Sequence, residues 1–222
     1  MDQLDSGVLD DDTTLVTLTA GGNDQDAFSN AFTECAGLVS DCSGPGFLAK
    51  YEGVIDGDIV PDTGRTIHMI NERAPNARIL LVSYPVIVST QTVCPGSPTT
   101  GLNESRDLAT LAEYLNDAES DMVGGLSLEH PTGGIAIVSP LAAFAGHAAC
   151  DSDPWINAVV VGPNGDGDFH KGDPESRLCA PAWVPAIGPC LSRESFHPTR
   201  EGSTTYEHVV EQWLTSIGYT GG

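Results

Sequence analysis

Three short runs of apolar and β-branched residues divide the chain, at residues 15–20, 78–85 and 135–138. The apolar positions in each run are continuous rather than alternating, which is typical of strands that are buried on both faces of a parallel sheet. The first run ends directly before two glycines and the second ends in a proline, as expected where a buried strand enters a turn.

Apolar positions at helical spacing lie between and after these runs. Residues 65–74 predict a helix that Pro75 ends, and Asn103 is predicted to cap a second helix with one apolar face. Residues 199–217 predict a closing helix. The inward-facing residues of the last two helices are predicted to be Leu108, Leu111, Ala112, Leu115 and Ala118, and Tyr206, Val209, Val210, Trp213 and Leu214.

The alternation of strands and helices predicts an α/β fold, in which helices cover both faces of a parallel sheet. We expect one domain over residues 1–222, with any functional site beyond the carboxyl ends of the strands. Two stretches lack the pattern. Residues 27–48 are expected to be turn-rich, and residues 146–195 are expected to be irregular because they are rich in glycine and proline.

Composition narrows the classes of function. The chain has 31 acidic and 9 basic residues and a formal net charge of -22. This excess of negative charge argues against binding to nucleic acid and against a polybasic membrane anchor. No apolar run reaches the ~18–20 residues that span a bilayer. Six cysteines indicate three disulfides and an oxidising compartment. Residues 1–5 lack the pattern of a signal peptide, so we expect a secreted protein whose amino-terminal part is not included.

The first candidate for chemistry is Gly21-Gly22-Asn23-Asp24, directly after the first predicted strand. The glycines let the backbone bend sharply, and they place Asn23 at the carboxyl end of the strand. An asparagine amide held there can donate a hydrogen bond to an oxyanion that develops in a reaction. The alternative is an ordinary turn, in which asparagine only tolerates a left-handed backbone conformation.

The second candidate is Glu194-Ser195-Phe196-His197-Pro198, just before the last predicted helix. A histidine at such a junction, with an acidic residue three positions before it, can act as a general base. The alternative is a surface histidine that lies beside the start of a helix.

Together these motifs resemble the SGNH (GDSL) hydrolase superfamily, and more narrowly its actinobacterial secreted lipase and esterase branch. Further similar pieces are Ala74-Pro75-Asn76-Ala77, Tyr84-Pro85, and Phe144-Ala145-Gly146-His147 followed by Cys150. The similarity runs from about Leu4 to Gly218. It implies a three-layer α/β/α, flavodoxin-like fold and serine-type hydrolysis of a small-molecule or lipid ester. It also implies a secreted monomer without metal or organic cofactor.

The resemblance implies a role for each matching residue. Asn23, with Gly22, is expected to form the oxyanion hole, and His197 is expected to be the catalytic base. Relatives orient this histidine either by an acidic side chain three residues before it, here Glu194, or by a backbone carbonyl two residues before it, here that of Ser195. Both alternatives remain open from the sequence.

The nucleophile of the family is the element that the chain lacks. It sits in a Gly-Asp-Ser block, which does not occur here, and Asp5-Ser6-Gly7 is only superficially similar. The strand that follows advances about 3.3 Å per residue, or roughly 20 Å, which places Ser6 near the end opposite Asn23. We therefore expect an incomplete sheet without its first two strands, an unpaired edge at residues 15–20, and little activity by the chain alone.

The cysteines fit three disulfides within this resemblance. It pairs Cys94 with Cys150, and the accompanying expectation is that Cys35 pairs with Cys42 and Cys179 with Cys190. A structural zinc site is the rival interpretation, but the chain has no Cys-x2-Cys pair.

Two alternative functions stay open at this stage. The chain could be a non-catalytic binding or structural relative of the hydrolases. It could also be an acidic calcium-binding protein, because the stretch from Asn164 to Glu175 mimics the ligand spacing of a calcium loop. The glycine required at the sixth position of that loop is replaced by Phe169, which favours a solvated acidic loop instead.

Overall fold

A computed structural model describes residue 4 and residues 6–36, 42–94, 101–129, 134–162 and 190–220. Its central sheet contains β1 (Leu15–Leu18), β2 (Arg78–Val82) and β3 (Ile135–Val138), in the order β1-β2-β3. All neighbouring strands are parallel, with Leu18 beside Leu81 and Leu81 beside Ile137. The three predicted strands and their parallel arrangement are therefore confirmed.

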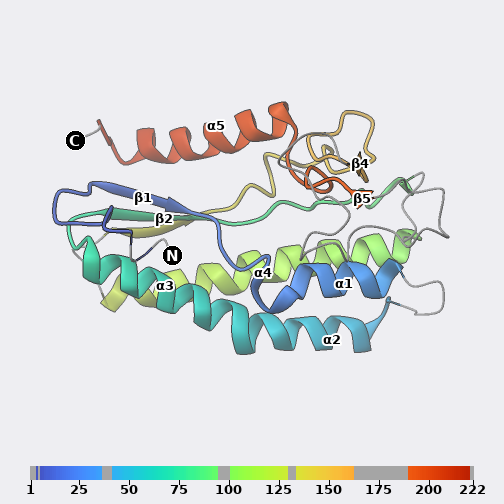
Figure 1. Ribbon diagram of the computed structural model, residues 1–222, viewed down its shortest axis with the longest axis horizontal. Coiled ribbons are helices and arrows are strands. Elements are labelled where there is room, and N and C mark those ends of the chain that lie inside the picture. Colours follow the sequence, from blue (N-terminus) through green and yellow to red (C-terminus); the bar gives the residue numbers. More distant parts are fainter. Residues whose placement is uncertain are drawn as a thin grey trace.

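Helices cover both faces of this sheet (Figure 1). Helices α3 (Val60–Arg73) and α4 (Leu102–Glu129) lie on one face, and α5 (Arg200–Ser216) lies on the other. Alternate residues of β2 point to opposite faces, so that Ile79 and Leu81 are buried in the cluster shared with α3 and α4. The arrangement is the three-layer α/β/α fold that the sequence predicts.

Strand β1 lies at the edge of the described sheet. It pairs with β2 alone among the described strands. Thr17, in the middle of the strand, is exposed. This is the edge position expected for residues 15–20.

The expectation of a turn-rich segment at residues 27–48 is wrong for the part that the structure describes. That part contains α1 (Ala27–Ala36) and the start of α2 (Pro45–Val54). Helix α2 continues through the π-helical turn η3 (Ile55–Ile59) directly into α3. Phe47, Tyr51, Ile55 and Ile59 recur every four residues and form one buried stripe. Because glycines and acidic residues lie between these four positions, the helical period is difficult to recognise in the sequence.

The ends of the later helices differ from the expectation by small amounts. Helix α4 begins at Leu102, so Asn103 lies in its first turn and is not its cap. Helix α5 is capped by Thr199, whose hydroxyl accepts the Gly202 N–H at 3.2 Å. The stretch expected to be irregular contains two short antiparallel strands, β4 (Val161–Gly162) and β5 (Cys190–Leu191).

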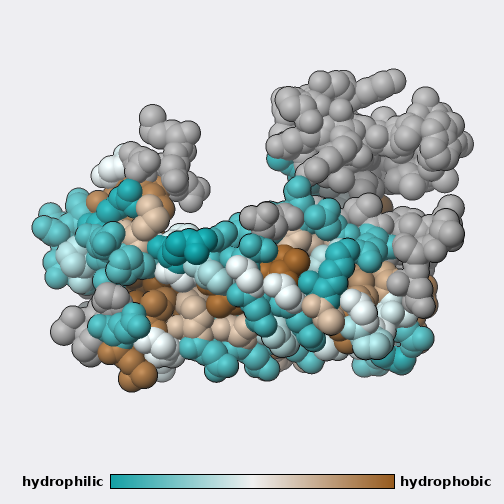
Figure 2. Space-filling model, turned by 90° about the horizontal axis from the view of Figure 1, so that it is seen from below, coloured by the Kyte–Doolittle hydropathy of each residue, from teal (hydrophilic) through white to brown (hydrophobic). Residues whose placement is uncertain are grey.

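The face of the molecule that is seen from below is mixed in hydropathy. Figure 2 shows hydrophilic residues interspersed with smaller hydrophobic patches on the face seen from below. No helix among the described residues combines the length and the apolar character that crossing a bilayer requires.

Candidate active site

The turn after β1 is shaped by close packing against its two glycines. Gly21 has a φ of +99°, and a Cβ atom there would lie 2.6 Å from the Cγ2 of Ile59. A Cβ atom on Gly22 would lie 2.8 Å from the Cζ of Tyr84. Glycine is therefore required at both positions, because any larger residue would collide with a neighbour that is itself packed.

Asn23 follows this turn at the carboxyl end of the sheet. It precedes the short 3-10 helix η2 (Asp24–Asp26), but its side chain makes no capping hydrogen bond. The residue is exposed. Its carboxamide thus lies beyond the end of β1 and does not cap the next helix.

The loop that carries His197 is fixed by its own backbone and by Asn157. The Asn157 N–H and Nδ2 both donate to the His197 carbonyl, at 2.9 Å and 3.2 Å, and the Phe196 N–H donates to the Asn157 carbonyl at 3.1 Å. Phe196 adopts a φ of +60°, which is uncommon for a bulky residue. These hydrogen bonds fix the backbone that carries the His197 side chain.

The His197 ring contacts the backbone two residues before it. Its Nδ1 lies 3.0 Å from the Ser195 carbonyl oxygen. The Ser195 hydroxyl donates to the Val160 carbonyl at 3.1 Å and accepts the Val160 N–H at 3.0 Å. Glu194 is exposed, and its carbonyl accepts the His197 N–H at 3.1 Å. Of the two orienting groups that the sequence left open, the Ser195 carbonyl is the one found at the ring.

Asn23 and His197 line the same cavity, although they are far apart in the sequence. The cavity has a volume of about 840 Å³ and extends between the strand ends, α1, α4 and α5. Its walls are largely apolar, with Phe28, Ile55, Leu108, Leu111, Leu115 and Val210 among the lining residues. Asn23 and His197 thus line one mainly hydrophobic cavity, together with other polar side chains that include Glu207 and Glu211 of α5. A largely apolar cavity with a few polar groups is typical of binding sites for small molecules.

Two tyrosines beside the cavity were not identified from the sequence. The Tyr84 hydroxyl accepts the Gly22 N–H at 3.1 Å, and the Tyr206 hydroxyl donates to the Ser83 carbonyl at 3.5 Å. Burial raises the pKa of both phenols. Both are thus neutral at physiological pH. Position in an apolar period was the only signal for Tyr206, and the pair Tyr84-Pro85 was the only signal for Tyr84.

Two residues named from the sequence differ from Asn23 and His197 in their placement. Gly22 lines the cavity, but its N–H has a partner, and Ser6 does not line it. The Gly22 N–H is already bonded to Tyr84, so it is not free to donate to an oxyanion. Ser6 does not line the cavity, and no serine is among the described residues that do. Leu4 and Leu9, on either side of Ser6 in the sequence, pack against the hydrophobic cluster between the sheet and helices α3 and α4.

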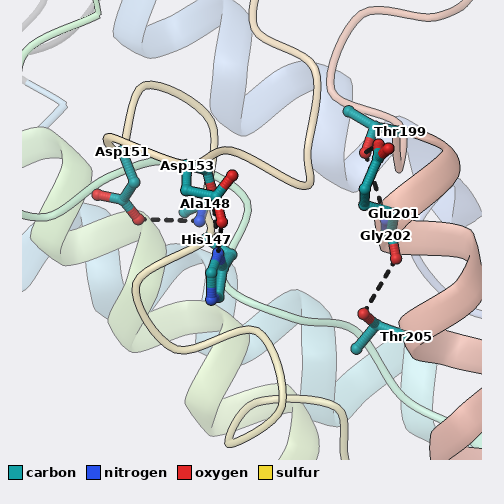
Figure 3. Close-up of polar contacts among 8 residues, drawn as sticks. All are labelled: His147, Ala148, Asp151, Asp153, Thr199, Glu201, Gly202 and Thr205. Atoms are coloured by element: carbon teal, nitrogen blue, oxygen red, sulfur yellow. Dashed lines mark hydrogen bonds and ion pairs between the residues drawn. The ribbon is translucent and has the colours of Figure 1, made fainter.

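The loop after β3 contacts the start of α5, and Figure 3 shows polar contacts within each of these two segments. His147 stacks on Trp155 with ring centroids 3.5 Å apart. Its Nδ1 lies 2.7 Å from the Asp153 carbonyl oxygen. The Ala148 N–H donates to the Asp151 carboxylate at 2.9 Å. The Trp155 carbonyl accepts the Thr199 N–H at 2.8 Å. Through this contact the loop holds the residue that caps α5, two positions after His197.

The predicted Cys94–Cys150 disulfide is present and joins the segments after β2 and β3. Cys42 is also disulfide-bonded. The Cys35 side chain and the whole of Cys179 lie outside the described residues, so the other two pairings stay predictions. The stretch from Asn164 to Glu175, which resembled a calcium loop, also lies outside them.

Comparisons with known proteins relate the chain to lipases, although no family model matches it. It is 28% identical to Lipase 1 of Streptomyces coelicolor over 153 residues, which cover 69% of this chain and 53% of that protein. The chain spans about half the length of the curated relatives it matches.

Two solved structures share the fold. An extracellular lipase from Streptomyces rimosus superposes with a TM-score of 0.63 and 22% identity, covering 92% of this chain and 70% of that one. Phospholipase A1 from Streptomyces albidoflavus NA297 gives a TM-score of 0.64 and 23% identity, covering 93% and 71%. The α/β fold is thereby confirmed, and the similarity in sequence to Streptomyces lipases agrees with the resemblance expected from the motifs.

Proposed function

We propose that this chain, a homologue of Streptomyces lipases of the SGNH type, provides the oxyanion donor, the general base and the acyl-binding cavity of a carboxylic ester hydrolase. The observation that carries the proposal is that Asn23 and His197 line one largely apolar cavity, at the carboxyl ends of parallel strands. The names of the relatives favour a lipid ester as the substrate.

The surroundings of His197 support its role as the base. A carbonyl oxygen can only accept a hydrogen bond, so the contact with Ser195 requires a proton on Nδ1. In the neutral ring, Nε2 then carries the lone pair. That atom can take the proton of an attacking hydroxyl and return it to the leaving group. The proposal therefore assigns the orienting role to the Ser195 carbonyl rather than to Glu194.

Asn23 supplies the donor for the oxyanion. Its carboxamide carries two N–H groups, and it is not engaged in capping η2. A donor held in place before the reaction stabilises the negative charge that develops on the ester oxygen. Gly22 is assigned a packing role, because Tyr84 occupies its N–H.

The cavity favours an ester with an apolar acyl group. Its lining is contributed mainly by aliphatic and aromatic side chains, so transfer of an alkyl chain from water is favourable by about 0.8 kcal/mol per buried methylene. The Cys94–Cys150 disulfide also agrees with function in an oxidising compartment. We therefore propose a secreted location.

None of the residues assigned above is the nucleophile of the proposed reaction. The sequence has no Gly-Asp-Ser block, and no serine is among the described residues that line the cavity. We therefore expect little or no hydrolysis of p-nitrophenyl esters by this chain alone. Turnover that is abolished in His197→Ala would overturn this part of the proposal, because the chain would then contain its own nucleophile.

Binding of a tetrahedral mimic tests the other part without needing turnover. An alkyl phosphonate monoester joins an apolar tail to an anionic head with the shape of the reaction intermediate. We expect calorimetry to show that Asn23→Ala and His197→Ala each weaken its binding about tenfold, which is the loss of one hydrogen bond to a charged group. The bond from His197 requires that Nε2 takes up a proton when the anion binds, as it does from the attacking hydroxyl in the proposed reaction.

Exposed residues of the same types provide matched controls. Asn103→Ala on α4 and His208→Ala on α5 should leave the affinity unchanged, because neither residue lines the cavity. Equal binding by all four variants would remove the proposed function and favour a non-catalytic relative.

A further inference from the structure

A buried acidic residue lies directly beneath the turn that carries Asn23. Glu119, on α4, is fully buried, and its Oε2 accepts the Ser83 hydroxyl at 2.5 Å. Its Oε1 has no hydrogen-bond partner in the part of the chain that the structure describes. The hydroxyl of Thr63, on α3, is buried and unpartnered in the same sense.

These two unpartnered oxygens face the glycine that starts the turn. A Cβ atom on Gly21 would lie 3.6 Å from the Thr63 Oγ1 and 3.8 Å from the Glu119 Oε1. Only a hydrogen atom on Gly21 separates the turn from the carboxyl group. The backbone of this turn therefore lies close to the unpartnered oxygen of Glu119, where a change in its charge or position would act on it.

A second route connects Glu119 to the same turn through the end of β2. Ser83, which donates to Glu119, is followed by Tyr84, which accepts the Gly22 N–H. One helical turn before Glu119, the Asn116 Nδ2 donates to the Tyr84 carbonyl at 2.8 Å. Helix α4 therefore fixes both Ser83 and Tyr84, and these in turn fix Gly22.

We propose that Glu119 is a positioning residue for the Asn23 donor. As a neutral carboxyl, Glu119 holds the Gly21–Gly22 turn in place, and its ionisation loosens the turn. The role in donor positioning rests on the proposed function, whereas the coupling between Glu119 and the turn does not. A negative charge with one oxygen unpartnered is costly in this interior, and outward movement of the turn would admit water to it.

The electrostatics of the cluster agree with this assignment. Burial raises the pKa of Glu119 to about 7, and the hydrogen bond from Ser83 offsets only part of that effect. The other titratable groups around the cluster are Tyr84 from the end of β2, Tyr206 from α5 and Asp24 from η2. The two phenols stay neutral through this range, because burial raises their pKa values as well.

Amide spectra recorded as a function of pH test the coupling directly. We expect the ¹H–¹⁵N signals of Gly21, Gly22 and Asn23 to shift with a midpoint near pH 7 in the wild-type chain. The same transition should be absent in Glu119→Gln, which keeps the shape of the side chain but cannot ionise. It should persist in Glu113→Gln, an exposed glutamate on the same helix.

Hydrogen exchange of the Gly22 amide gives a second measurement that needs no variant. Its protection, corrected for the intrinsic effect of pH, should fall at least threefold between about pH 5 and pH 9 as Glu119 ionises. Unchanged protection together with unshifted amide signals would overturn the coupling, as would a transition that survives in Glu119→Gln.

The affinity for the phosphonate separates this inference from the proposed function. The contribution of Asn23 is measured as the ratio of the phosphonate affinity of the wild type to that of Asn23→Ala. If Glu119 positions the donor, this ratio should fall above pH 7. In the Glu119→Gln background the ratio should stay constant with pH. A turn that titrates in a chain whose phosphonate affinity never depends on Asn23 would retain the coupling and remove the function. A phosphonate affinity that falls in Asn23→Ala by the same factor at every pH, with or without Glu119→Gln, would retain the proposed function and remove the positioning role of Glu119.

Discussion

At the scale of single residues, the candidate site depends on residues that do not contact the ligand as well as on those that do. These are the two glycines of the turn and the buried carboxyl group beneath it. Gly21 and Gly22 are needed because Ile59 and Tyr84 occupy the space of a side chain. Glu119 lies below them and has one oxygen without a partner among the described residues. The residues that touch a ligand in our proposal, Asn23 and His197, are both exposed.

Substitution of Gly22 tests the close approach of Tyr84. Gly22→Ala would place a methyl group 2.8 Å from the tyrosine ring, and we expect a loss of about 1–3 kcal/mol in the free energy of unfolding. Gly124→Ala on α4 is the matched control, because a Cβ atom there would have no heavy atom within 4 Å among the described residues. That variant should gain about 0.5–1 kcal/mol from helix propensity. Equal urea midpoints for the two variants would contradict the packing argument.

The stability of the chain should fall as pH rises through the range in which Glu119 ionises. The folded-state pKa is about 7, against an ordinary value of 4.5, so the folded chain holds this proton more tightly than the unfolded chain. Its stabilising effect is complete below about pH 4.5 and is lost by pH 7 and above.

Denaturation by urea at pH 5 and pH 8 measures this loss. Glu119→Gln should be more stable relative to wild type at pH 8 than at pH 5, by at most about 3 kcal/mol. Glu113→Gln should show no such difference between the two pH values. A constant gap between wild type and Glu119→Gln would show that Glu119 ionises freely in the folded state.

At the scale of elements, the sequence predicts those strands and helices whose buried residues form an uninterrupted run or period of apolar positions. Strand β3 has the predicted bounds, and α5 differs from the prediction only at its caps. Helices α1 and α2 were missed because glycine and polar residues interrupt their apolar stripes, and tertiary contacts compensate for the weak propensity. Asn23 and His197 could be named because each follows or precedes a recognisable element. Glu119 could not, since an acidic residue on a helix usually faces solvent.

The start of α5 offers a test at this scale. Thr199→Ala removes the hydroxyl that accepts the Gly202 N–H, and we expect a cost of about 1 kcal/mol in the free energy of unfolding. Thr204→Ala, at an exposed position inside the same helix, should be neutral or slightly stabilising. The comparison requires only two urea titrations. Identical midpoints would show that α5 does not depend on this cap.

At the scale of the whole molecule, the charge is one-sided, since 31 acidic residues face 9 basic ones. Such an excess of like charge opposes the compact state by self-repulsion. The ion pairs Lys50–Glu34 and Arg65–Asp62 are at the surface and screen little of it.

Salt should therefore stabilise the protein. We expect the melting temperature to rise by several degrees between about 0.01 M and 0.2 M sodium chloride, as the Debye length shortens to below 10 Å. Sodium sulfate at equal ionic strength should raise it further. A melting temperature that falls with sodium chloride would mean that attractive pairs, rather than repulsion, dominate the electrostatics.

The contact between His197 and the Ser195 carbonyl has a consequence for the tolerance of the site. An amide oxygen is not protonated in any medium in which proteins stay folded, so acid cannot detach it from the imidazole, and no side-chain replacement can delete it. If the main chain orients the ring, as we propose, position 194 should accept neutral, basic or bulky residues, with the tautomer of the ring preserved.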